Sequence, residues 1–441
     1  AGVATALGLG RWLRTAGGDA EGTGPGPAML ADCCEAIIGA IYLDGGMPMP
    51  ADNRRPRPET RIIRTRARAS HYREQVTPIY MASGFTFDSA DQARAIYGGE
   101  EPGYVYTRWD NPNSAELVAR LCGMEGAEAG LPMASGMAAL FTIMAGLLNS
   151  GDHVVASRSL FGATHQLLTT ILPRWGIAHS YADCELTETW PGLFRPETRL
   201  CLVETPSNPG LTLVDLAWVA ALCRERNVLM VVDNTFATPV IQHPLALGAD
   251  LVVHSTTKFL DGQGRTIGGV ILGDRLVVNE LTHFARQTGP TLSPFNSWLL
   301  SQSLETLPLR MERHCANALA LAEWLSRRAG VETVRYPFLP SHPQAALARR
   351  QMSAGGGIVT FEVSGGLPAG RRFLDGLKMC DIVANLGDAR TTVTHPASTT
   401  HSALTDGERR MVGITPGLIR VSVGLEHIDD IIADIDQALG N

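Results

Sequence analysis

Short, nearly continuous apolar runs recur through the middle of the chain. Each run is six or seven residues long and is bounded by turn-forming residues. Apolar runs of this length without polar alternation are typical of strands that are buried on both faces, as in parallel sheets. We therefore predict five strands, at Asp152–Ser157, Arg199–Thr205, Val228–Asn234, Ala249–Ser255 and Gly268–Gly273.

Segments with a helical spacing of apolar residues separate several of these runs, as at Leu216–Arg226. Alternation of helices and buried strands predicts an α/β fold in which a mainly parallel sheet is covered on both faces. A long helical pattern follows at Leu309–Arg328, and further apolar runs lie at Ile358–Val363 and Leu418–Gly424. We expect this tail to form a smaller C-terminal α+β domain, joined to the sheet by the long helix.

The beginning of the chain differs from the rest in composition. Gly17–Pro27 is rich in glycine and proline, Met29–Leu43 has the spacing of one amphipathic helix, and Asp52–Ser70 is rich in arginine and broken by proline. Such changes are typical of linkers and domain boundaries. We predict four parts, namely an appendage at 1–50, an arm at 51–110, a large domain at 111–308 and a C-terminal domain at 309–441.

The overall composition is that of a globular protein. The chain has 441 residues, of which 45% are hydrophobic and 18% are charged, and its formal net charge is −7. These values exclude a disordered or fibrous chain, and they leave no overall basic field to attract a nucleic acid or an anionic membrane. We therefore expect neither as a partner, and no apolar run has the length of a membrane span.

The eight cysteines are scattered along the chain, and none forms a C-x-x-C pair. This spacing predicts neither a zinc site nor a disulfide framework, and we expect no metal. Unpaired, mostly buried thiols are typical of a reducing compartment, so we expect a cytoplasmic protein.

Lysine is rare, which narrows the candidates for amine chemistry. Lys258 and Lys378 are the only lysines, and every other basic residue is an arginine. Lys258 follows the predicted strand Ala249–Ser255, and ligands bind at the carboxyl ends of strands in open α/β sheets. The hydroxyls of Ser255 and Thr257 beside it suit a phosphate group. A solvated surface lysine is the alternative, but a surface cation can equally be arginine, whereas imine chemistry requires an amine.

Asp233 ends another predicted strand, 25 residues before Lys258. That interval fits one helical segment and one strand, so the two strand ends can lie near one another. A carboxylate in this position can pair with the protonated pyridine nitrogen of pyridoxal phosphate (PLP), which PLP requires to act as an electron sink. A helix cap is the alternative role for an aspartate before a turn.

Three further features suit the phosphate and the ring of such a cofactor. Ser135–Met137 opens a helical run, and a helix N-terminus offers free N–H groups to an anion. Tyr106 and Arg108 point the same way if their segment is extended, and arginine binds phosphate well. Phe161, shortly after a strand, can stack on a flat ring. Each feature alone also has an ordinary structural explanation, but together they match the needs of one PLP cofactor.

From about Pro56 to its end, the chain resembles the Cys/Met-metabolism family of PLP-dependent enzymes, also called the trans-sulfuration family. The motifs that carry the resemblance occur in the family's order, and they are YTRWDNPN, ASGMAAL, ETPSNPG, VVDNTFATP, HSTTKFLDGQGR, THPASTTH and GLIRVSVGLEHIDD. The resemblance implies PLP as the cofactor. It also implies the fold of type I PLP-dependent transferases, with a large, mainly parallel sheet domain and a smaller C-terminal α+β domain.

The resemblance assigns the cofactor contacts residue by residue. Lys258 matches the lysine that binds PLP covalently, Asp233 matches the partner of the pyridine nitrogen, and Phe161 occupies the position of the ring-stacking residue. The residues that match the phosphate site are Ser135, Gly136, Met137, Ser255 and Thr257.

Four other matches concern the neighbouring subunit and the substrate. Tyr106 and Arg108 match a pair that reaches the phosphate of a neighbouring subunit's cofactor. That match implies a homo-oligomer, a dimer or more often a dimer of dimers, in which residues 51–110 are the arm that contributes to the neighbour. Asn385 and Arg420 match the residues that hold the substrate's α-carboxylate.

Within the family, the chain most resembles the homoserine-ester sulfhydrylases. Phe161 stands where the lyases and cystathionine γ-synthase usually have a tyrosine. The segments SRSLFGATHQLL, TGPTLSPFNSW and ANLGDAR also resemble the sulfhydrylases most. The resemblance implies γ-replacement on O-succinyl- or O-acetyl-homoserine by sulfide, which gives homocysteine for methionine biosynthesis. Cystathionine γ-synthase or γ-lyase activity is the alternative.

Residues 1–48 do not share this resemblance. The runs LGLGRWLRT and PAMLADCCEAIIGAIYLDGG resemble the late part of the ribonuclease III catalytic domain, and Asp32 and Glu35 match two of its metal-binding acids. The earlier acidic motif and the double-stranded-RNA-binding domain of that family are absent from the sequence. We therefore expect a non-functional appendage, and an RNA-processing protein is the alternative from another class.

Overall fold

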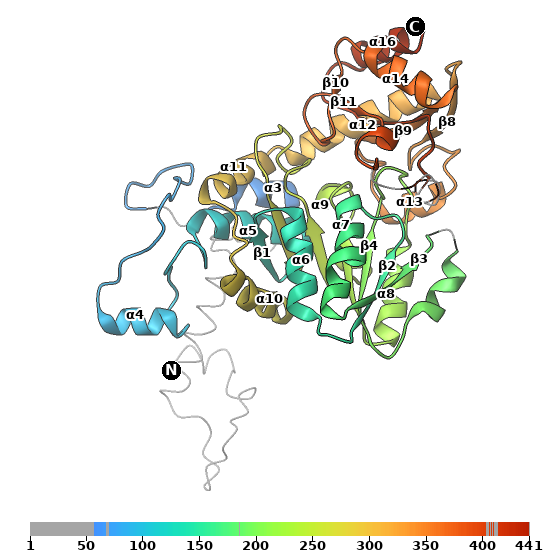
Figure 1. The fold of residues 1–441 in the computed structure, drawn as a ribbon. Helices are drawn as coiled ribbons and strands as arrows, with labels where there is room; N and C mark the ends of the chain where they lie inside the picture. The colour runs from blue at the N-terminus through green and yellow to red at the C-terminus, as the bar shows by residue number, and fades with distance from the viewer. Residues whose placement is uncertain are drawn as a thin grey trace, which may run out of the picture. The chain divides into compact units, whose positions relative to one another are not determined.

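The computed structural model describes residues 57–440, except for residues 68–69, 185, 403–404, 406, 408 and 410–412. From Pro58 onward the chain forms one compact unit (Figure 1). The predicted appendage at 1–50, with Asp32 and Glu35, lies outside the described residues. None of the helices within the described ranges is long and apolar enough to cross a membrane.

A seven-stranded sheet forms the centre of this unit. Four of its pairings are parallel, and only the strand Gly269–Gly273 runs antiparallel to its two neighbours. The fold is therefore the α/β type with a mainly parallel sheet, as the apolar runs predicted. In their order across the sheet, the strands are β1 (Ala129–Met133), β7 (Gly269–Gly273), β6 (Leu251–His254), β5 (Leu229–Asp233), β4 (Thr198–Glu204), β2 (His153–Ser157) and β3 (Ala178–Ala182).

Helices connect the strands and continue the chain beyond them. Several begin at a side chain that accepts a hydrogen bond from the first turn, as Ser135 and Asp274 do, which satisfies N–H groups that lack a partner in the helix. The helices are α3 (Pro58–Arg64), α4 (Ala90–Tyr97), α5 (Pro112–Glu125), α6 (Gly136–Leu147), α7 (Gly162–Gln166), α8 (Leu216–Glu225), α9 (Thr238–Ile241), α10 (Arg275–Thr288), α11 (Pro294–Leu304), α12 (Leu307–Leu325), α13 (Ala345–Gln351), α14 (Gly366–Gly376) and α16 (Ile428–Leu439), with shorter turns η2 (Leu167–Ile171), η3 (Leu172–Trp175), η4 (Thr187–Leu193), η5 (Leu245–Leu247) and η6 (Pro396–Ser398).

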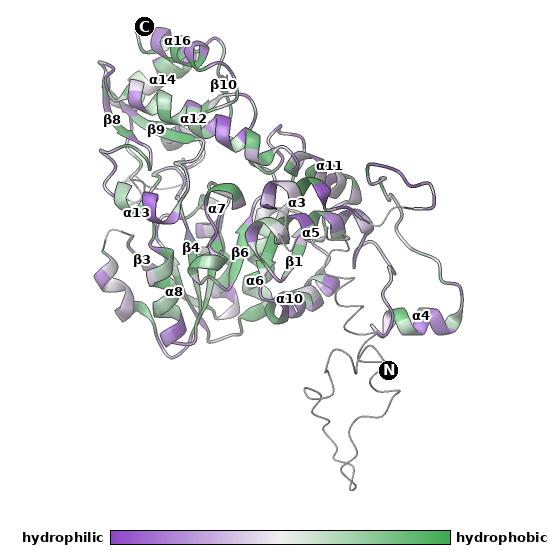
Figure 2. Ribbon diagram, turned by 180° about the vertical axis from the view of Figure 1, so that it is seen from behind, coloured by the Kyte–Doolittle hydropathy of each residue, from purple (hydrophilic) through white to green (hydrophobic). Residues whose placement is uncertain are grey.

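Both faces of the large sheet are buried, which explains why its strands are continuous apolar runs. Leu200 and Leu202 of β4 pack in a cluster with α6 and α10, whereas the alternating residues Cys201 and Val203 pack in a second cluster with α8. Successive side chains of a strand point to opposite faces, so a strand between two helical layers needs apolar residues throughout. Figure 2 shows the hydrophobic strands β4 and β6 between these helices.

Two strands of the large sheet escape prediction because they lie at its edges. β1 contains Gly130 and Pro132, which weaken a strand signal but are tolerated at an edge. β3 has the sequence AHSYA and is only partly buried, so it lacks a continuous apolar run. A strand that is buried on both faces can be predicted from its continuous apolar run. These two edge strands are not buried in this way.

A second, five-stranded sheet lies in the C-terminal part of the unit. The predicted runs near 358 and 418 form two of its strands, and α12, α14 and α16 pack against it. In order, the strands are β10 (Asp381–Ile382), β11 (Thr392–Thr394), β12 (Leu418–Ser422), β9 (Ile358–Val363) and β8 (Val331–Arg335).

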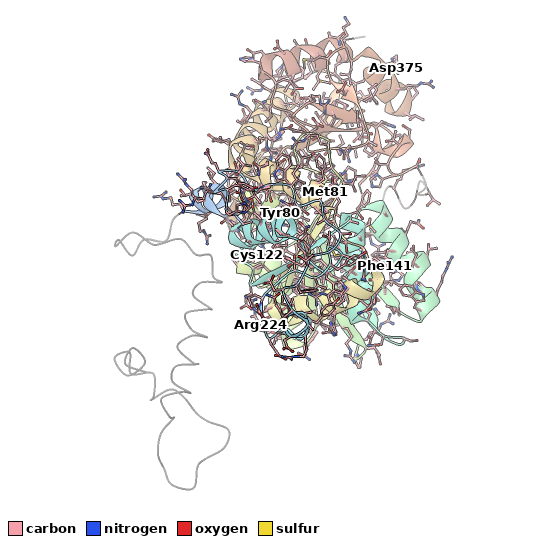
Figure 3. The ribbon with its side chains drawn as sticks, turned by 90° about the vertical axis from the view of Figure 1, so that its left-hand side faces the viewer. Tyr80, Met81, Cys122, Phe141, Arg224 and Asp375 are labelled. Carbon is pink, nitrogen blue, oxygen red and sulfur yellow. The ribbon has the colours of Figure 1, made fainter. Side chains whose placement is uncertain are left out.

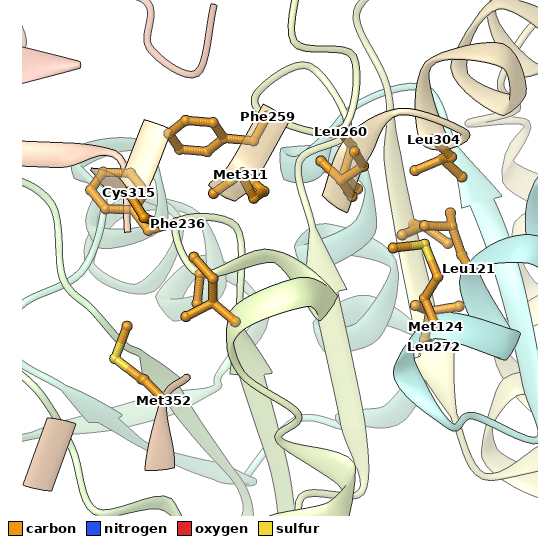
Figure 4. Packing of buried hydrophobic residues seen from close by; sticks show 14 of the residues in the cluster. Leu121, Met124, Phe236, Phe259, Leu260, Leu272, Leu304, Met311, Cys315 and Met352 are labelled. Carbon is orange, nitrogen blue, oxygen red and sulfur yellow. The ribbon is translucent and has the colours of Figure 1, made fainter. Parts of the chain in front are cut away.

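Helix α12 connects the cores of the two sheets. Its first turns place Met311 in the apolar cluster that also holds Phe259 and Leu260, the two residues after Lys258 (Figure 4). Its last turns place Leu321 in the cluster of the second sheet. The backbone that follows Lys258 is therefore packed directly in the core that α12 shares with both sheets.

Arg310, in the first turn of α12, holds the same backbone through hydrogen bonds. Its buried guanidinium donates to the carbonyl oxygen of Phe259 at 2.6 Å and to that of Ser303 at 2.9 Å. Burial lowers the pKa of Arg310 to about 10, so the group stays charged at neutral pH. A charged donor between buried carbonyl groups is costly to remove, because the carbonyl oxygens then lose their partner.

We predict that Arg310→Met lowers the free energy of unfolding by roughly 2–4 kcal/mol, because buried carbonyl oxygens are left without donors. Urea denaturation of the purified protein measures this change. Arg371→Met, on an exposed arginine of α14, is the matched control and should leave the midpoint nearly unchanged. Equal midpoints for the two variants would contradict the prediction.

Candidate active site

A cavity of about 390 Å³ lies where strands β4, β5 and β6 end. Its volume is in the range of small-molecule sites, and its position is the usual one for ligands of open α/β sheets. Ten predicted site residues line it, and they are Ser135, Gly136, Met137, Phe161, Asp233, Ser255, Thr257, Lys258, Asn385 and Arg420.

The amine of Lys258 faces this cavity. Its Nζ donates a hydrogen bond to Oδ1 of Asn385, which comes from the C-terminal part of the chain. Burial, together with the positive charge of Arg420, lowers the pKa of Lys258 to about 8. A neutral, nucleophilic amine is therefore accessible close to neutral pH.

Asp233 ends β5 on another wall of the cavity. Its Oδ1 accepts hydrogen bonds from the N–H of Thr235 at 3.0 Å and from the hydroxyl of Thr235 at 2.5 Å. Its other oxygen has no hydrogen bond among the described residues, and burial raises the pKa of the carboxyl group. Asp233 caps none of the described helices, so it is free to pair with a cationic nitrogen in the cavity.

The start of α6 provides an anion site. The hydroxyl of Ser135 accepts from the N–H of Ala138 at 3.0 Å, so this side chain serves the helix. The N–H groups of Gly136 and Met137 remain without an acceptor among the described residues, and they belong to the positive end of the helix dipole. A Cβ at Gly136 would lie 2.9 Å from the Cβ of Ser255, so glycine allows the helix start and the end of β6 to approach.

The two predicted hydroxyl ligands differ in their availability. The Thr257 hydroxyl donates to the carbonyl oxygen of Gly268 at 3.3 Å and accepts from the N–H of Gly268 at 3.1 Å. The Ser255 hydroxyl has no such bond among the described residues, although its backbone N–H donates to the Thr235 hydroxyl at 2.9 Å. Ser255 can therefore donate to an anion without breaking a bond, whereas Thr257 has to exchange one.

Arg420, on β12, brings a buried positive charge to the cavity. It donates to Oδ1 of Asn208 at 3.0 Å and to the carbonyl oxygen of Ala384 at 2.8 Å, while its Nε lacks a partner. Within the part of the chain that the structure describes, no carboxylate pairs with it. Burial lowers the pKa of Arg420 to about 10. A buried guanidinium without a counter-charge favours a ligand that carries a carboxylate.

Several lining residues were not predicted. Glu204 ends β4 at the same edge as Asp233, so the rule that selected Asp233 could also have selected it. Asn208 lies four residues further on, and its importance appears only through its contact with Arg420. The other unpredicted lining residues are Leu140, Thr164, Thr235, Phe236, Ala384, Leu386 and Thr400.

Tyr106 and Arg108 do not line the cavity of their own chain. The Arg108 guanidinium lies 5.5 Å from the centre of the Tyr106 ring and donates to the carbonyl oxygen of Arg286. Figure 1 shows that α4, which precedes this pair in sequence, lies apart from the body of the unit. The same arm exposes large apolar side chains, including Met81 at 70% (Figure 3) and Tyr97 at 59%.

Comparisons with known proteins agree with this geometry. Residues 59–440 match the family described as Cys/Met metabolism PLP-dependent enzyme. An O-succinylhomoserine sulfhydrylase of Pseudomonas aeruginosa is 46% identical over 381 residues, which cover 86% of this chain and 94% of that protein. An L-methionine gamma-lyase of Pseudomonas putida is 44% identical over 366 residues, which cover 82% of this chain and 92% of that protein.

A solved structure shares the fold as well as the sequence. It is a putative O-acetylhomoserine (thiol)-lyase of Campylobacter jejuni that carries a pyridoxyl-lysine phosphate. It superimposes with a TM-score of 0.84 at 31% identity, covering 88% of this chain and all of that one. The comparisons give no support for the resemblance of residues 1–48 to ribonuclease III, because the family match begins at residue 59. From residue 59 onward, the chain belongs to the PLP-dependent enzymes of Cys/Met metabolism.

Proposed function

We propose that this chain is an O-acylhomoserine sulfhydrylase, which replaces the acyl group of O-succinyl- or O-acetyl-homoserine with sulfide and forms homocysteine. One observation carries the proposal, namely that Asn385 contacts both cationic groups of the cavity. Its side-chain oxygen accepts from the Lys258 amine, and its backbone carbonyl accepts at 3.2 Å from Arg420, which has no carboxylate partner among the described residues. The proposed complex has an amino acid between these groups, with its carboxylate on Arg420 and its α-carbon toward Lys258. The sulfhydrylase named above supports the acylated homoserine as the substrate.

PLP is the cofactor of the family, and the cavity has groups that suit each part of it. Asp233 suits the ring nitrogen and Phe161 the ring face. The free N–H groups of Gly136 and Met137, with the Ser255 hydroxyl, suit the phosphate. When bound, PLP supplies an electron sink for negative charge that develops on the substrate's carbons.

The chain's own residues then position the substrate and move its protons. Arg420 binds the α-carboxylate and fixes the α-carbon near Lys258. The Lys258 amine removes the proton from Cα and exchanges protons at Cβ, because its lowered pKa lets it act as both base and acid. Departure of the acyl group from Cγ and addition of sulfide at the same carbon complete the replacement.

We further propose that the protein is a homo-oligomer, a dimer of dimers, in which Tyr106 and Arg108 of one subunit reach the phosphate site of the next. Their position outside the cavity of their own chain supports this arrangement, as do the exposed apolar side chains of the arm. Burial of such side chains against a second copy is favourable.

The predicted parts 51–110, 111–308 and 309–441 and the cytoplasmic location belong to the same proposal. Helix α12 begins at Leu307, next to this boundary, and packs first in the core of the large sheet and then in that of the second sheet, which supports the boundary between the two larger parts. Six free cysteines among the described residues support a reducing compartment.

We predict that the purified protein converts O-succinylhomoserine and sulfide to homocysteine, and that Lys258→Ala lowers the rate by roughly a thousandfold or more. Amino-acid analysis of the products measures this. Lys378→Ala, which changes the other, exposed lysine, is the control and should keep full activity. Faster formation of cystathionine from added cysteine, or faster breakdown of cystathionine, would favour the cystathionine γ-synthase or cystathionine γ-lyase alternative.

We predict that covalent capture of PLP by the cofactor-free protein accelerates with rising pH and is half-maximal near pH 8, because the neutral Lys258 amine is the nucleophile. Arg420→Leu should move this midpoint upward, since loss of a nearby positive charge makes the protonated amine less costly. Arg420→Lys keeps the charge and should keep the midpoint. Stopped-flow absorbance measures the rates, and a wild-type midpoint near the ordinary value of 10.5 would contradict the assignment.

We predict that Arg108→Ala and Lys258→Ala chains, each nearly inactive, recover roughly a quarter of the wild-type activity when they are mixed and refolded together. A mixed pair contains one site with both an intact lysine and an intact neighbouring arginine. Lys258→Ala mixed with Asp233→Ala is the control, and it should recover nothing because both residues lie in one cavity. Equal recovery in the two mixtures would contradict the exchange of arms.

A further inference from the structure

Glu204 is a buried carboxylate on the cavity wall whose two oxygens serve different segments. It is the last residue of β4 and is 6% exposed. Its Oε2 accepts from the backbone N–H of Phe161 at 2.7 Å, and its Oε1 accepts from the backbone N–H of Asn208 at 3.0 Å. Hydrogen bonds of this length connect both backbone segments to one carboxyl group.

The two segments face different parts of the ligand site. Phe161 precedes α7, and its side chain lines the cavity on the side proposed for the cofactor ring. Asn208 accepts from the guanidinium of Arg420, which is the group proposed for the substrate carboxylate. A single side chain therefore connects the ring side of the cavity with its carboxylate side.

Glu204 also lies beside a second buried carboxylate. In the parallel pairing of β4 with β5, Glu204 is the partner of Asp233. Burial and the neighbouring charge of Asp233 raise the pKa of Glu204 to about 8, while the two N–H donors favour its charged form. Two carboxylates at adjacent strand ends cost stability. The hydrogen bonds that Glu204 makes offset part of that cost.

We propose that Glu204 is a positioning residue that sets Phe161 and, through Asn208, Arg420 in one arrangement, so that cofactor and substrate are bound by a coupled pair of segments. This inference rests on the proposed function only for the identity of the substrate. It differs from a simple capping role at α7, because such a role would leave the contacts of Arg420 unchanged.

Glu204→Gln tests the proposal, because the amide NH2 replaces one of the two acceptor oxygens and leaves one of the two N–H groups facing a donor. We expect the dissociation constant for PLP, measured by fluorescence titration of the cofactor-free protein, to rise about tenfold. We also expect the KM for O-succinylhomoserine to rise by about the same factor, with a smaller change in kcat. Glu204→Asp keeps the charge but is too short to span both donors, so it should show the same two changes.

Three variants serve as references. Phe161→Ala should weaken PLP binding alone, and Asn208→Ala should raise the KM alone, because each removes one of the two connected groups. Glu332→Gln makes the same chemical change on an exposed residue of β8 and should change neither quantity.

The proposal is overturned if a folded Glu204 variant changes only one of the two quantities, or if it lowers the urea midpoint while both stay at the wild-type value. Either variant that folds is decisive. If the wild-type protein binds PLP but has no sulfhydrylase activity, the KM is replaced by the dissociation constant of an α-amino acid. This constant is measured from the change in cofactor absorbance that the bound amino acid causes. Failure of the proposed function is then distinguishable from failure of the role of Glu204.

Discussion

The cavity separates its positive groups from its negative groups. Arg420 lies on β12 of the second sheet, and the amine of Lys258, which follows β6 of the first, donates to Asn385. Asp233 and Glu204 end strands of the first sheet, and no ion pair joins the two sets among the described residues. Neutral carbonyl, amide and hydroxyl groups hold the charges instead. Unpaired buried charges cost folding free energy. In the proposed complex, the substrate carboxylate pairs with Arg420 and the cationic ring nitrogen of PLP pairs with Asp233.

This separation requires that two sheets keep a fixed arrangement. The acids end β4 and β5, whereas Arg420 lies on β12, more than 180 residues later in the chain. Helix α12 packs in both cores, and Arg310 holds the backbone beside Lys258. A shift of α12 would therefore move the amine relative to the guanidinium, and the pKa of Lys258 depends on that relation. Stability of the helix and reactivity of the lysine are linked in this way.

The features that the sequence predicted correctly are those that depend on single residues or on short runs of residues. Strands buried on both faces need unbroken apolar runs, and a lone amine or an acid at a strand end is visible one residue at a time. The edge strands β1 and β3 were not predicted, because a partly buried edge strand needs no continuous apolar run. Glu204 and Asn208 escaped because their contacts are backbone N–H groups and a distant arginine, which tertiary packing alone brings near. For Tyr106 and Arg108, the residue types alone do not indicate which chain's cavity they serve, and the expectation of a neighbouring subunit comes from the family resemblance.

The choice of residue 161 constrains how protons move in the cavity. Its ring contributes a flat apolar face and no exchangeable proton, whereas a tyrosine in the same place would offer a phenol. The other ionisable lining groups have other contacts, since Arg420 is a fixed cation, Asp233 faces the ring nitrogen in the proposed complex, and the two oxygens of Glu204 accept from backbone N–H groups. The Lys258 amine, with a pKa of about 8, is the group that the proposed complex places beside the substrate's α-carbon, where it can both take and return a proton near neutral pH. In the proposed reaction one amine must then serve Cα and Cβ in turn, which requires the Lys258 side chain to move between these two carbons.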